Sequence, residues 1–208
     1  ELVGQYEVPT EWLPWLHAEC KGRSLGFMCT AYRADDVTLI DPWVAMHKIA
    51  SFDVGNEALV RAVIATGKPI LVSLGLGQSR CIAFRDAPDR TIPLHCVSAY
   101  PTPPEEVNMA VMRGMTGRHG FSDHTIGQMA AVLAVALGAE YIEKHIRHPK
   151  TLAENPDYAA AASPDEFFRY VCAIREAEVM MGDGQRRVQD SEMVAYKYDT
   201  ITGPRGGD

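Results

Sequence analysis

Short apolar runs alternate with helical patterns along most of this 208-residue chain, and this alternation limits the folds open to it. Each run has six or seven residues. Strands that read as near-continuous apolar runs, each followed by a helix, are typical of a parallel sheet covered by helices on its outer face. We therefore expect an α/β fold with strands over residues 25–31, 46–51, 69–75, 92–98, 119–124 and 140–146.

Capping residues mark where several of the helices should begin and end. Asn56 is a helix cap, and Gly67 closes the same helix. Residues 102–105 and 163–166 each have the pattern of a capping box with proline at the first helical position, and the first of them predicts a helix through residue 112. A further helix is expected from about residue 125 to 137.

Polar side chains stand at the carboxyl end of each expected strand. In a barrel these ends meet at one mouth, where barrel enzymes place their sites, whereas a doubly wound sheet would spread them along an edge. No GxGxxG or GxxxxGK[ST] motif supports a nucleotide-binding sheet. We therefore predict a TIM-type (β/α)8 barrel, here incomplete with about six β/α units. The polar residues that would share the mouth are Thr30, Lys48, Ser51, Ser73, Ser98, Tyr100, Ser122, His124 and His145.

His124 and His145 close two successive strands of that barrel. Adjacent parallel strands lie ~5 Å apart, so two imidazoles at corresponding ends are placed to share one divalent ion that acts as a Lewis acid. Asp157 follows in a loop and is expected to hydrogen-bond a metal-bound water. The alternative is that both are structural histidines with ordinary hydrogen-bond partners.

Charge and cysteine content limit which binding partners and which cellular compartment are expected. A formal net charge of -7, without a Lys/Arg cluster, argues against nucleic acid and anionic membranes, and favours small-molecule substrates. Five cysteines without CxxC spacing fit reduced thiols in a cytoplasmic protein. Cys96 beside His95 suggests a thiol–imidazole pair, and the alternative is that Cys96 is a buried small apolar residue. No apolar run approaches the ~20 residues that cross a bilayer.

The motifs KIASFD, GKPILVSLG, LHCVSAYPTPPEEVNM, GFSDHTIG, ALGAEYIEKHI and NPDYAAAASPDEF occur in this order. Together, from about residue 27 to 182, they resemble the sialic acid synthase family, which includes the pseudaminic and legionaminic acid synthases. The resemblance implies condensation of phosphoenolpyruvate with an N-acetylmannosamine-like amino sugar, giving a nine-carbon 2-keto acid and phosphate.

The resemblance also implies residue roles. His124 and His145 match the histidines that bind manganese. The enolpyruvate carboxylate and phosphate would be held by the positions Thr30, Lys48, Ser51, Ser73, Ser98, Tyr100 and Ser122. Asp53 stands where the family usually has glutamate, and is expected to orient the sugar or manage a proton.

The chain also departs from the family pattern. It is expected to form one domain over residues 1–208, with a loop and helix in residues 1–24 and a C-terminal tail in residues 183–208. Against the family pattern, this sequence is expected to lack the first two barrel strands and the C-terminal domain. An open barrel exposes sheet edges, so we expect a homo-oligomer. A non-catalytic relative that keeps the scaffold, with or without a metal or phosphate site, is the alternative to a synthase.

Overall fold

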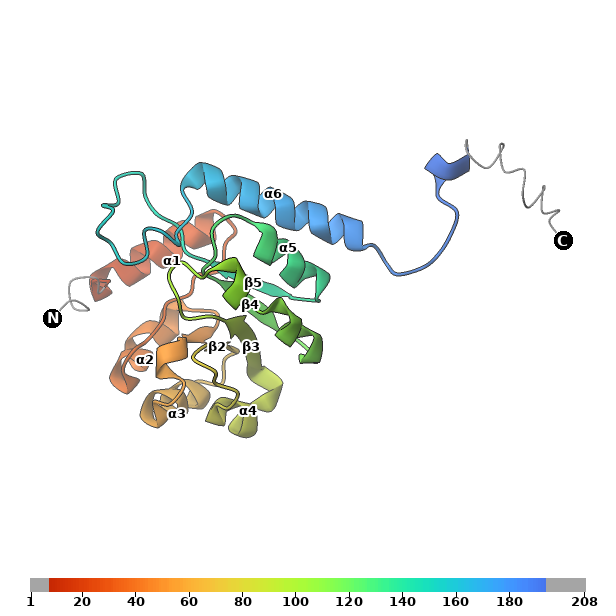
Figure 1. Cartoon of the computed structure of the whole chain (residues 1–208). Coiled ribbons are helices and arrows are strands. Elements are labelled where there is room, and N and C mark those ends of the chain that lie inside the picture. Colours follow the sequence, from red (N-terminus) through yellow and green to blue (C-terminus); the bar gives the residue numbers. More distant parts are fainter. Residues whose placement is uncertain (1–7, 194–208) are drawn as a thin grey trace.

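The computed structural model describes residues 8–193 of the chain. Its centre is a parallel sheet in which each strand pairs with the next strand along the chain. Figure 1 shows these strands side by side, with helices around them. The strands are β1 His47–Ile49, β2 Ile70–Leu74, β3 Thr91–Cys96, β4 Gly120–Asp123 and β5 Tyr141–Lys144. Sequential parallel pairing is the topology of a TIM-type barrel, and confirms the predicted fold class in incomplete form.

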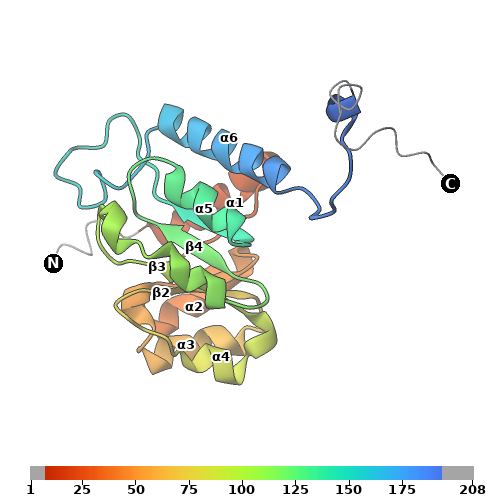
Figure 2. The same ribbon diagram turned by 45° about the vertical axis from the view of Figure 1, so that its right-hand side comes forward.

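Two groups of helices cover different parts of this sheet. The helices α2, α3 and α4 lie along the first strands, whereas α5 and α6 lie together near the last ones (Figures 1 and 2). The α-helices of the described chain, including α1 before the sheet, are α1 Leu13–Gly22, α2 Ala34–Ile40, α3 Glu57–Ala65, α4 Ile82–Asp86, α5 Met129–Ala136 and α6 Pro164–Met181. None of the helices within residues 8–193 combines the length and apolar character needed to cross a membrane.

Strand alternation sorts side chains between the helical layer and the barrel interior. In β1, Ile49 joins the main apolar core with residues of α3, while the neighbouring Lys48 reaches Ser73 on β2. Successive strand residues point to opposite faces, so Lys48 and Ser73 face the interior. The polar interior and the apolar outer layer therefore both follow from the period of two.

Two of the expected caps are confirmed. The Asn56 side chain accepts a hydrogen bond from the Leu59 amide at the start of α3. At α6, Ser163 Oγ accepts from the Glu166 amide and Glu166 Oε2 accepts from the Ser163 amide, which completes a capping box.

The prediction of a capping box at residues 102–105 is wrong. Thr102 donates its hydroxyl to the carbonyls of Val97 and Ala99, so its side chain is turned back toward β3. The following residues form two 3-10 segments, Pro104–Glu106 and Met109–Gly114. They are separated at Asn108, whose φ of 48° cannot continue a right-handed helix.

The strand expected over residues 25–31 is reduced to a single bridge. Thr30 pairs in parallel with Lys48, and the rest of that run forms no ladder in the described chain. The predicted six units therefore become five strands with one bridge beside β1. At the other edge, every residue of β5 is half-buried rather than buried.

Candidate active site

A cavity of about 480 Å³ opens at the carboxyl ends of the strands. Asp157 lines it, together with eight of the nine residues predicted for the barrel mouth: Thr30, Lys48, Ser51, Ser73, Tyr100, Ser122, His124 and His145. Segments that are distant in sequence thus meet in one place, as the parallel strand topology requires.

Ser98 and Asp53 are not among the lining residues but lie next to them. The hydroxyls of Ser98 and Ser51 share a hydrogen bond of 2.7 Å. Asp53 ends the 3-10 turn that follows β1, where burial raises its pKa and the charge of Lys48 partly opposes that rise. Both residues therefore border the cavity from the loops around it.

Lys48 supplies a buried positive charge inside this cavity. Only 7% of its side chain is exposed, and Nζ donates to Ser73 Oγ at 2.8 Å and to the Ile49 carbonyl at 3.2 Å. Burial lowers the pKa of Lys48, while the nearby Glu143 carboxylate, 3.6 Å away, raises it. An ammonium held in this way is placed to bind an oxyanion.

Glu143 is a cavity residue that the sequence reasoning missed. Its Oε1 accepts from Ser122 Oγ at 2.8 Å, and its Oε2 is the one that faces Lys48. Glu143 is on β5, two residues before His145, which follows the strand end; the period of two puts both side chains on the interior face. That spacing in the EKH motif was the available signal.

A close approach of backbone and side chain explains the glycine after β2. A Cβ built on Gly75 would lie 2.1 Å from Ser98 Oγ and 3.0 Å from Ser51 Cβ. The Ser51–Ser98 hydrogen bond therefore occupies the space that a side chain at residue 75 would need.

His124 and His145 are brought together as predicted. Their ring centroids are 5.2 Å apart, and the Tyr100 ring packs 4.1 Å from that of His124. His124 Nδ1 donates to the Val97 carbonyl at 2.7 Å, which leaves the lone pair on Nε2. His145 Nδ1 lies 3.5 Å from Asp157 Oδ2.

These two imidazoles fit a divalent metal in donor chemistry and tautomer. A ligating histidine commonly donates its other ring nitrogen to a carbonyl or carboxylate, and both rings have such a partner at Nδ1. Burial lowers the pKa of His124, which favours the neutral form that binds metals. No group of three or more His, Cys, Asp or Glu residues within 8–193 is arranged as a complete ligand set. Any metal here would therefore draw further ligands from water or substrate.

A polar network lies directly behind the two histidines. Asp123 and Lys144, each one residue before a histidine, are paired across β4 and β5 with 3.5 Å between Oδ2 and Nζ. Asp123 Oδ1 accepts from the amide and hydroxyl of Thr125, and its Oδ2 accepts from Tyr170 of α6 at 2.7 Å. Lys144 also donates to the Thr125 carbonyl. The network fixes the strand ends that carry the histidines.

The predicted pairing of His95 with Cys96 is wrong. Adjacent residues of a strand face opposite sides, so His95 turns outward and bonds the Val107 carbonyl at 2.7 Å. Cys96 faces the cavity, where its Sγ lies 3.9 Å from His124 Nδ1.

Tyrosines also contribute to the cavity. Burial, with the negative charges around it, raises the pKa of Tyr100 to about 12, so its hydroxyl stays protonated at neutral pH. Tyr32, which the sequence reasoning missed, lines the same cavity. Nothing in its local sequence distinguishes it from an ordinary surface tyrosine.

Comparisons with known proteins agree with this geometry. A model of the NeuB family matches residues 1–186. Pseudaminic acid synthase of Campylobacter jejuni is 33% identical, over 89% of this chain and 57% of the relative. N,N'-diacetyllegionaminic acid synthase of Legionella pneumophila is 30% identical, over 82% of this chain and 52% of the relative. The chain thus spans about half the length of the curated relatives it matches.

Solved structures give the same result. N-acetylneuraminic acid synthetase from Leptospira borgpetersenii superposes with a TM-score of 0.82 at 27% identity, over 94% of this chain and 72% of that one. A truncated 3-deoxy-D-arabino-heptulosonate 7-phosphate synthase from Thermotoga maritima, 14% identical with a TM-score of 0.66, shares the fold alone. With the extent of the family match, these findings show that the chain belongs to the NeuB family, the family of the sialic, pseudaminic and legionaminic acid synthases.

Proposed function

We propose that this chain carries the active site of a sugar-acid synthase. The reaction would form a bond between the methylene carbon of phosphoenolpyruvate and the aldehyde carbon of an N-acetylated hexosamine-type sugar. Water would add at C2 of the enolpyruvate and phosphate would leave from it, giving a nine-carbon 2-keto acid. The observation that carries the proposal is the convergence of Lys48, the hydroxyl residues and the histidine pair on one cavity. Membership of a family of such synthases supports it.

In this proposal Lys48 and the hydroxyl groups hold the enolpyruvate. Lys48 would supply the positive charge for phosphate or carboxylate, and Ser73 already fixes the direction of its Nζ. Thr30, Ser51, Ser98, Ser122 and Tyr100 would supply hydroxyl donors. Ser51 and Ser98 are hydrogen-bonded to one another, so less side-chain ordering is needed on binding.

The histidine pair would bind a metal ion that acts on the sugar's carbonyl group. His124 and His145 would hold a divalent metal, which we propose to be Mn²⁺, through Nε2, with Nδ1 kept on its protein partner. When bound, such an ion acts as a Lewis acid toward a carbonyl oxygen. Tyr100, packed on His124, would fix the ring plane.

Carboxylates around the cavity have separate tasks in this proposal. Asp157 would orient His145 through Nδ1 and reach a metal-bound water, while Asp53 would orient the sugar or manage a proton. Glu143 would position Lys48 and Ser122, which it contacts directly. Because aspartate is shorter by one methylene than the glutamate usual at residue 53 in the family, Asp53 has a shorter reach toward substrate.

Calorimetric titration with phosphoenolpyruvate, with and without Mn²⁺, tests the proposal. We expect binding that Mn²⁺ strengthens in the native chain but not in the His124→Ala, His145→Ala double variant. His148→Ala, which removes an exposed histidine, is the matched control. Lys48→Gln should abolish binding in both conditions. Sugar turnover would then be measured by phosphate release.

A non-catalytic relative is the second candidate, favoured by the half-buried β5 and the open sheet edges. Absence of phosphoenolpyruvate binding with or without Mn²⁺ would support it. We also propose, from the exposed apolar residues Phe168, Val179 and Met180 on α6, that the chain forms a homo-oligomer. A cytoplasmic location is proposed from its five free cysteines. A monomeric mass in solution would contradict the assembly.

A further inference from the structure

A second, smaller cavity of about 230 Å³ lies beside the first. It is bounded by the loop between β4 and α5, by the segment after β5 and by the first turns of α6. Lys144 lines both cavities, so its side chain stands between them. Four successive alanines, residues 159–162, form part of the wall, and their small side chains leave the space open.

The charged side chains around this cavity are mostly cations. Lys144, Arg147 and Arg169 contribute three positive charges, and Glu166 is the single carboxylate among the lining residues. Glu166 is already engaged, since its Oε2 accepts from the Ser163 amide and lies 3.1 Å from Arg147 Nη2. Lys144 is likewise paired with the buried Asp123 carboxylate, so the net positive charge at the cavity wall is that of Arg169.

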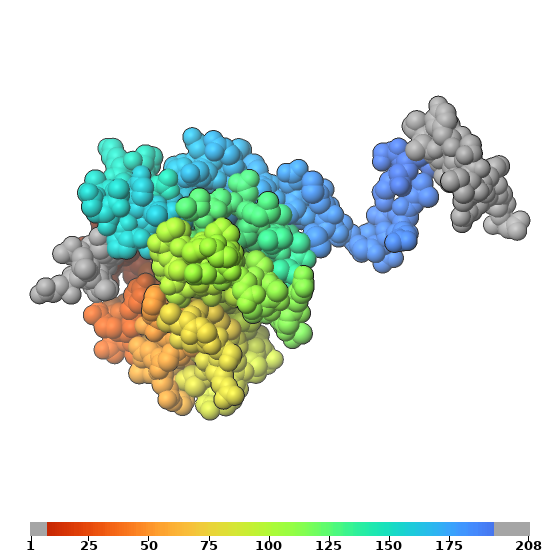
Figure 3. Space-filling model, viewed as in Figure 1, coloured from red at the N-terminus to blue at the C-terminus, as the bar shows by residue number. Residues whose placement is uncertain are grey.

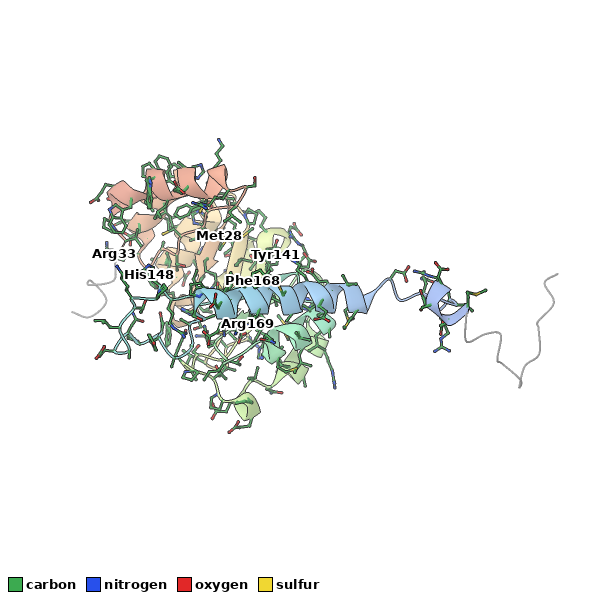
Figure 4. The ribbon with its side chains drawn as sticks, turned by 90° about the horizontal axis from the view of Figure 1, so that it is seen from above. Met28, Arg33, Tyr141, His148, Phe168 and Arg169 are labelled. Carbon is green, nitrogen blue, oxygen red and sulfur yellow. The ribbon has the colours of Figure 1, made fainter. Side chains whose placement is uncertain are left out.

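Several donors facing this space are not used by the protein. Arg169 makes no hydrogen bond or ion pair with the described residues, and Figure 4 labels it on the side of α6 near α5. Arg147 donates from Nη2 to Glu166 and from Nη1 to the Tyr158 carbonyl, and its other N–H groups remain available. Lys144 Nζ, by contrast, is engaged by the Thr125 carbonyl and the Asp123 carboxylate.

Backbone amides add to these side chains. Gly127 and Gln128 line the cavity immediately before α5, a helix with no side-chain cap at its N-terminus. Within residues 8–193, their amides donate to no protein acceptor. Uncapped amides at a helix start favour an anion, and barrel enzymes frequently hold phosphate with loops after the last strands and a helix N-terminus.

We propose that this second cavity, which we call the Arg169 cavity, binds a phosphate group at a site separate from the proposed enolpyruvate site. Arg169 would supply the positive charge and paired N–H donors to the phosphate, and Arg147 would add the N–H groups that Glu166 and the Tyr158 carbonyl leave unused. The phosphate would come either from free inorganic phosphate or from a phosphate ester on a small molecule.

Calorimetric titration of the full chain with inorganic phosphate tests the proposal, in native protein saturated with phosphoenolpyruvate and in the Lys48→Gln variant. Both conditions remove the mouth cavity as a phosphate site, so the remaining binding reports on the Arg169 cavity. We expect binding to persist in both, and Arg169→Gln to weaken it about tenfold, as for loss of one charge-assisted hydrogen bond. Arg175→Gln, an exposed charge change on the same helix, should leave it unchanged.

The outcomes separate this proposal from the proposed function. Phosphate binding that Lys48→Gln abolishes and Arg169→Gln leaves intact would overturn it, as would equal weakening by Arg169→Gln and Arg175→Gln. Failure of phosphoenolpyruvate to bind would leave the Lys48→Gln titration as a complete test, because that variant needs no second ligand. Repeating the native titration with a hexosamine 6-phosphate and its unphosphorylated sugar distinguishes ester from free phosphate as the source.

Discussion

The two halves of the barrel are stabilised in different ways. The half with β1 to β3 and α2 to α4 is built around a large apolar core that includes Ile49, Leu59, Val60, Ile70 and Val72, all essentially inaccessible to solvent. The half with β4, β5, α5 and α6 has a smaller apolar cluster around Phe121 and Ala134. Figure 3 shows these halves as the orange-to-yellow and green-to-blue parts of the body.

Polar contacts connect the elements of the second half, where the apolar cluster is smaller. The Asp123–Lys144 pair, with Tyr170 and Thr125, ties β4, β5 and α6 together behind the histidines. Several apolar side chains of α6 stay exposed, including Phe168 at 70%. Stability and metal-ligand positioning therefore lie in different halves of this barrel: the apolar half supplies stability, and the polar half positions the candidate metal ligands.

The largest expected effect comes from breaking the polar network. Lys144→Met leaves the buried Asp123 carboxylate without its cation, and should lower the free energy of unfolding by about 3–5 kcal/mol. Urea unfolding measures this, with the exposed Lys150→Met as control, expected within about 0.5 kcal/mol of the native value. Equal effects of the two variants would mean that the network contributes no stability.

A matched pair of isoleucines compares the two halves directly. Ile49→Ala in β1 removes a fully buried side chain and should cost about 2–5 kcal/mol. Ile142→Ala in the half-buried β5 should cost markedly less, because water already reaches that residue. Urea unfolding of both variants gives the comparison. A larger loss of unfolding free energy for Ile142→Ala would show that the second half, not the first, contributes more apolar stabilisation.

Helix caps test whether the halves unfold together. Asn56→Ala and Ser163→Ala each remove one cap, on α3 and α6 respectively, and each should cost about 1 kcal/mol. If the domain unfolds in one step, circular dichroism will show one transition that both variants shift. Two transitions, each shifted by only one variant, would show that the halves are independent.

The smallest expected effect is a loss of unfolding free energy at acid pH, caused by Asp41 in the apolar half. A hydrogen bond from His47, with Lys68 nearby and burial opposing, lowers the pKa of Asp41. A lowered folded-state pKa stabilises the fold above the ordinary value of about 3.9, and this stabilisation is lost as pH falls through the lowered pKa.

Asp41→Asn should therefore flatten the decline of unfolding free energy below about pH 4. The exposed Asp89→Asn variant is the control and should keep the native slope. An unchanged slope in Asp41→Asn would assign the acid sensitivity to other carboxylates. Urea unfolding at a series of acidic pH values provides the measurement.

Local sequence signals predicted much of the fold. The α3 and α6 caps at Asn56 and Ser163 formed as expected, because a cap depends on residues within one turn. The expected helix at residue 103 failed because Thr102 found acceptors at Val97 and Ala99, outside the window that a capping pattern considers.

The parallel β/α order and the set of polar residues at the strand ends could be predicted from the sequence, because periodicity and capping are properties of neighbouring residues. The sequence did not determine that Glu143 would contact both Lys48 and Ser122, or that Tyr170 would reach Asp123 from α6. Those contacts join residues far apart in the chain. Only the register of adjacent strands and the packing of α6 brought them within hydrogen-bond distance, and so decided which charges are paired behind and inside the site.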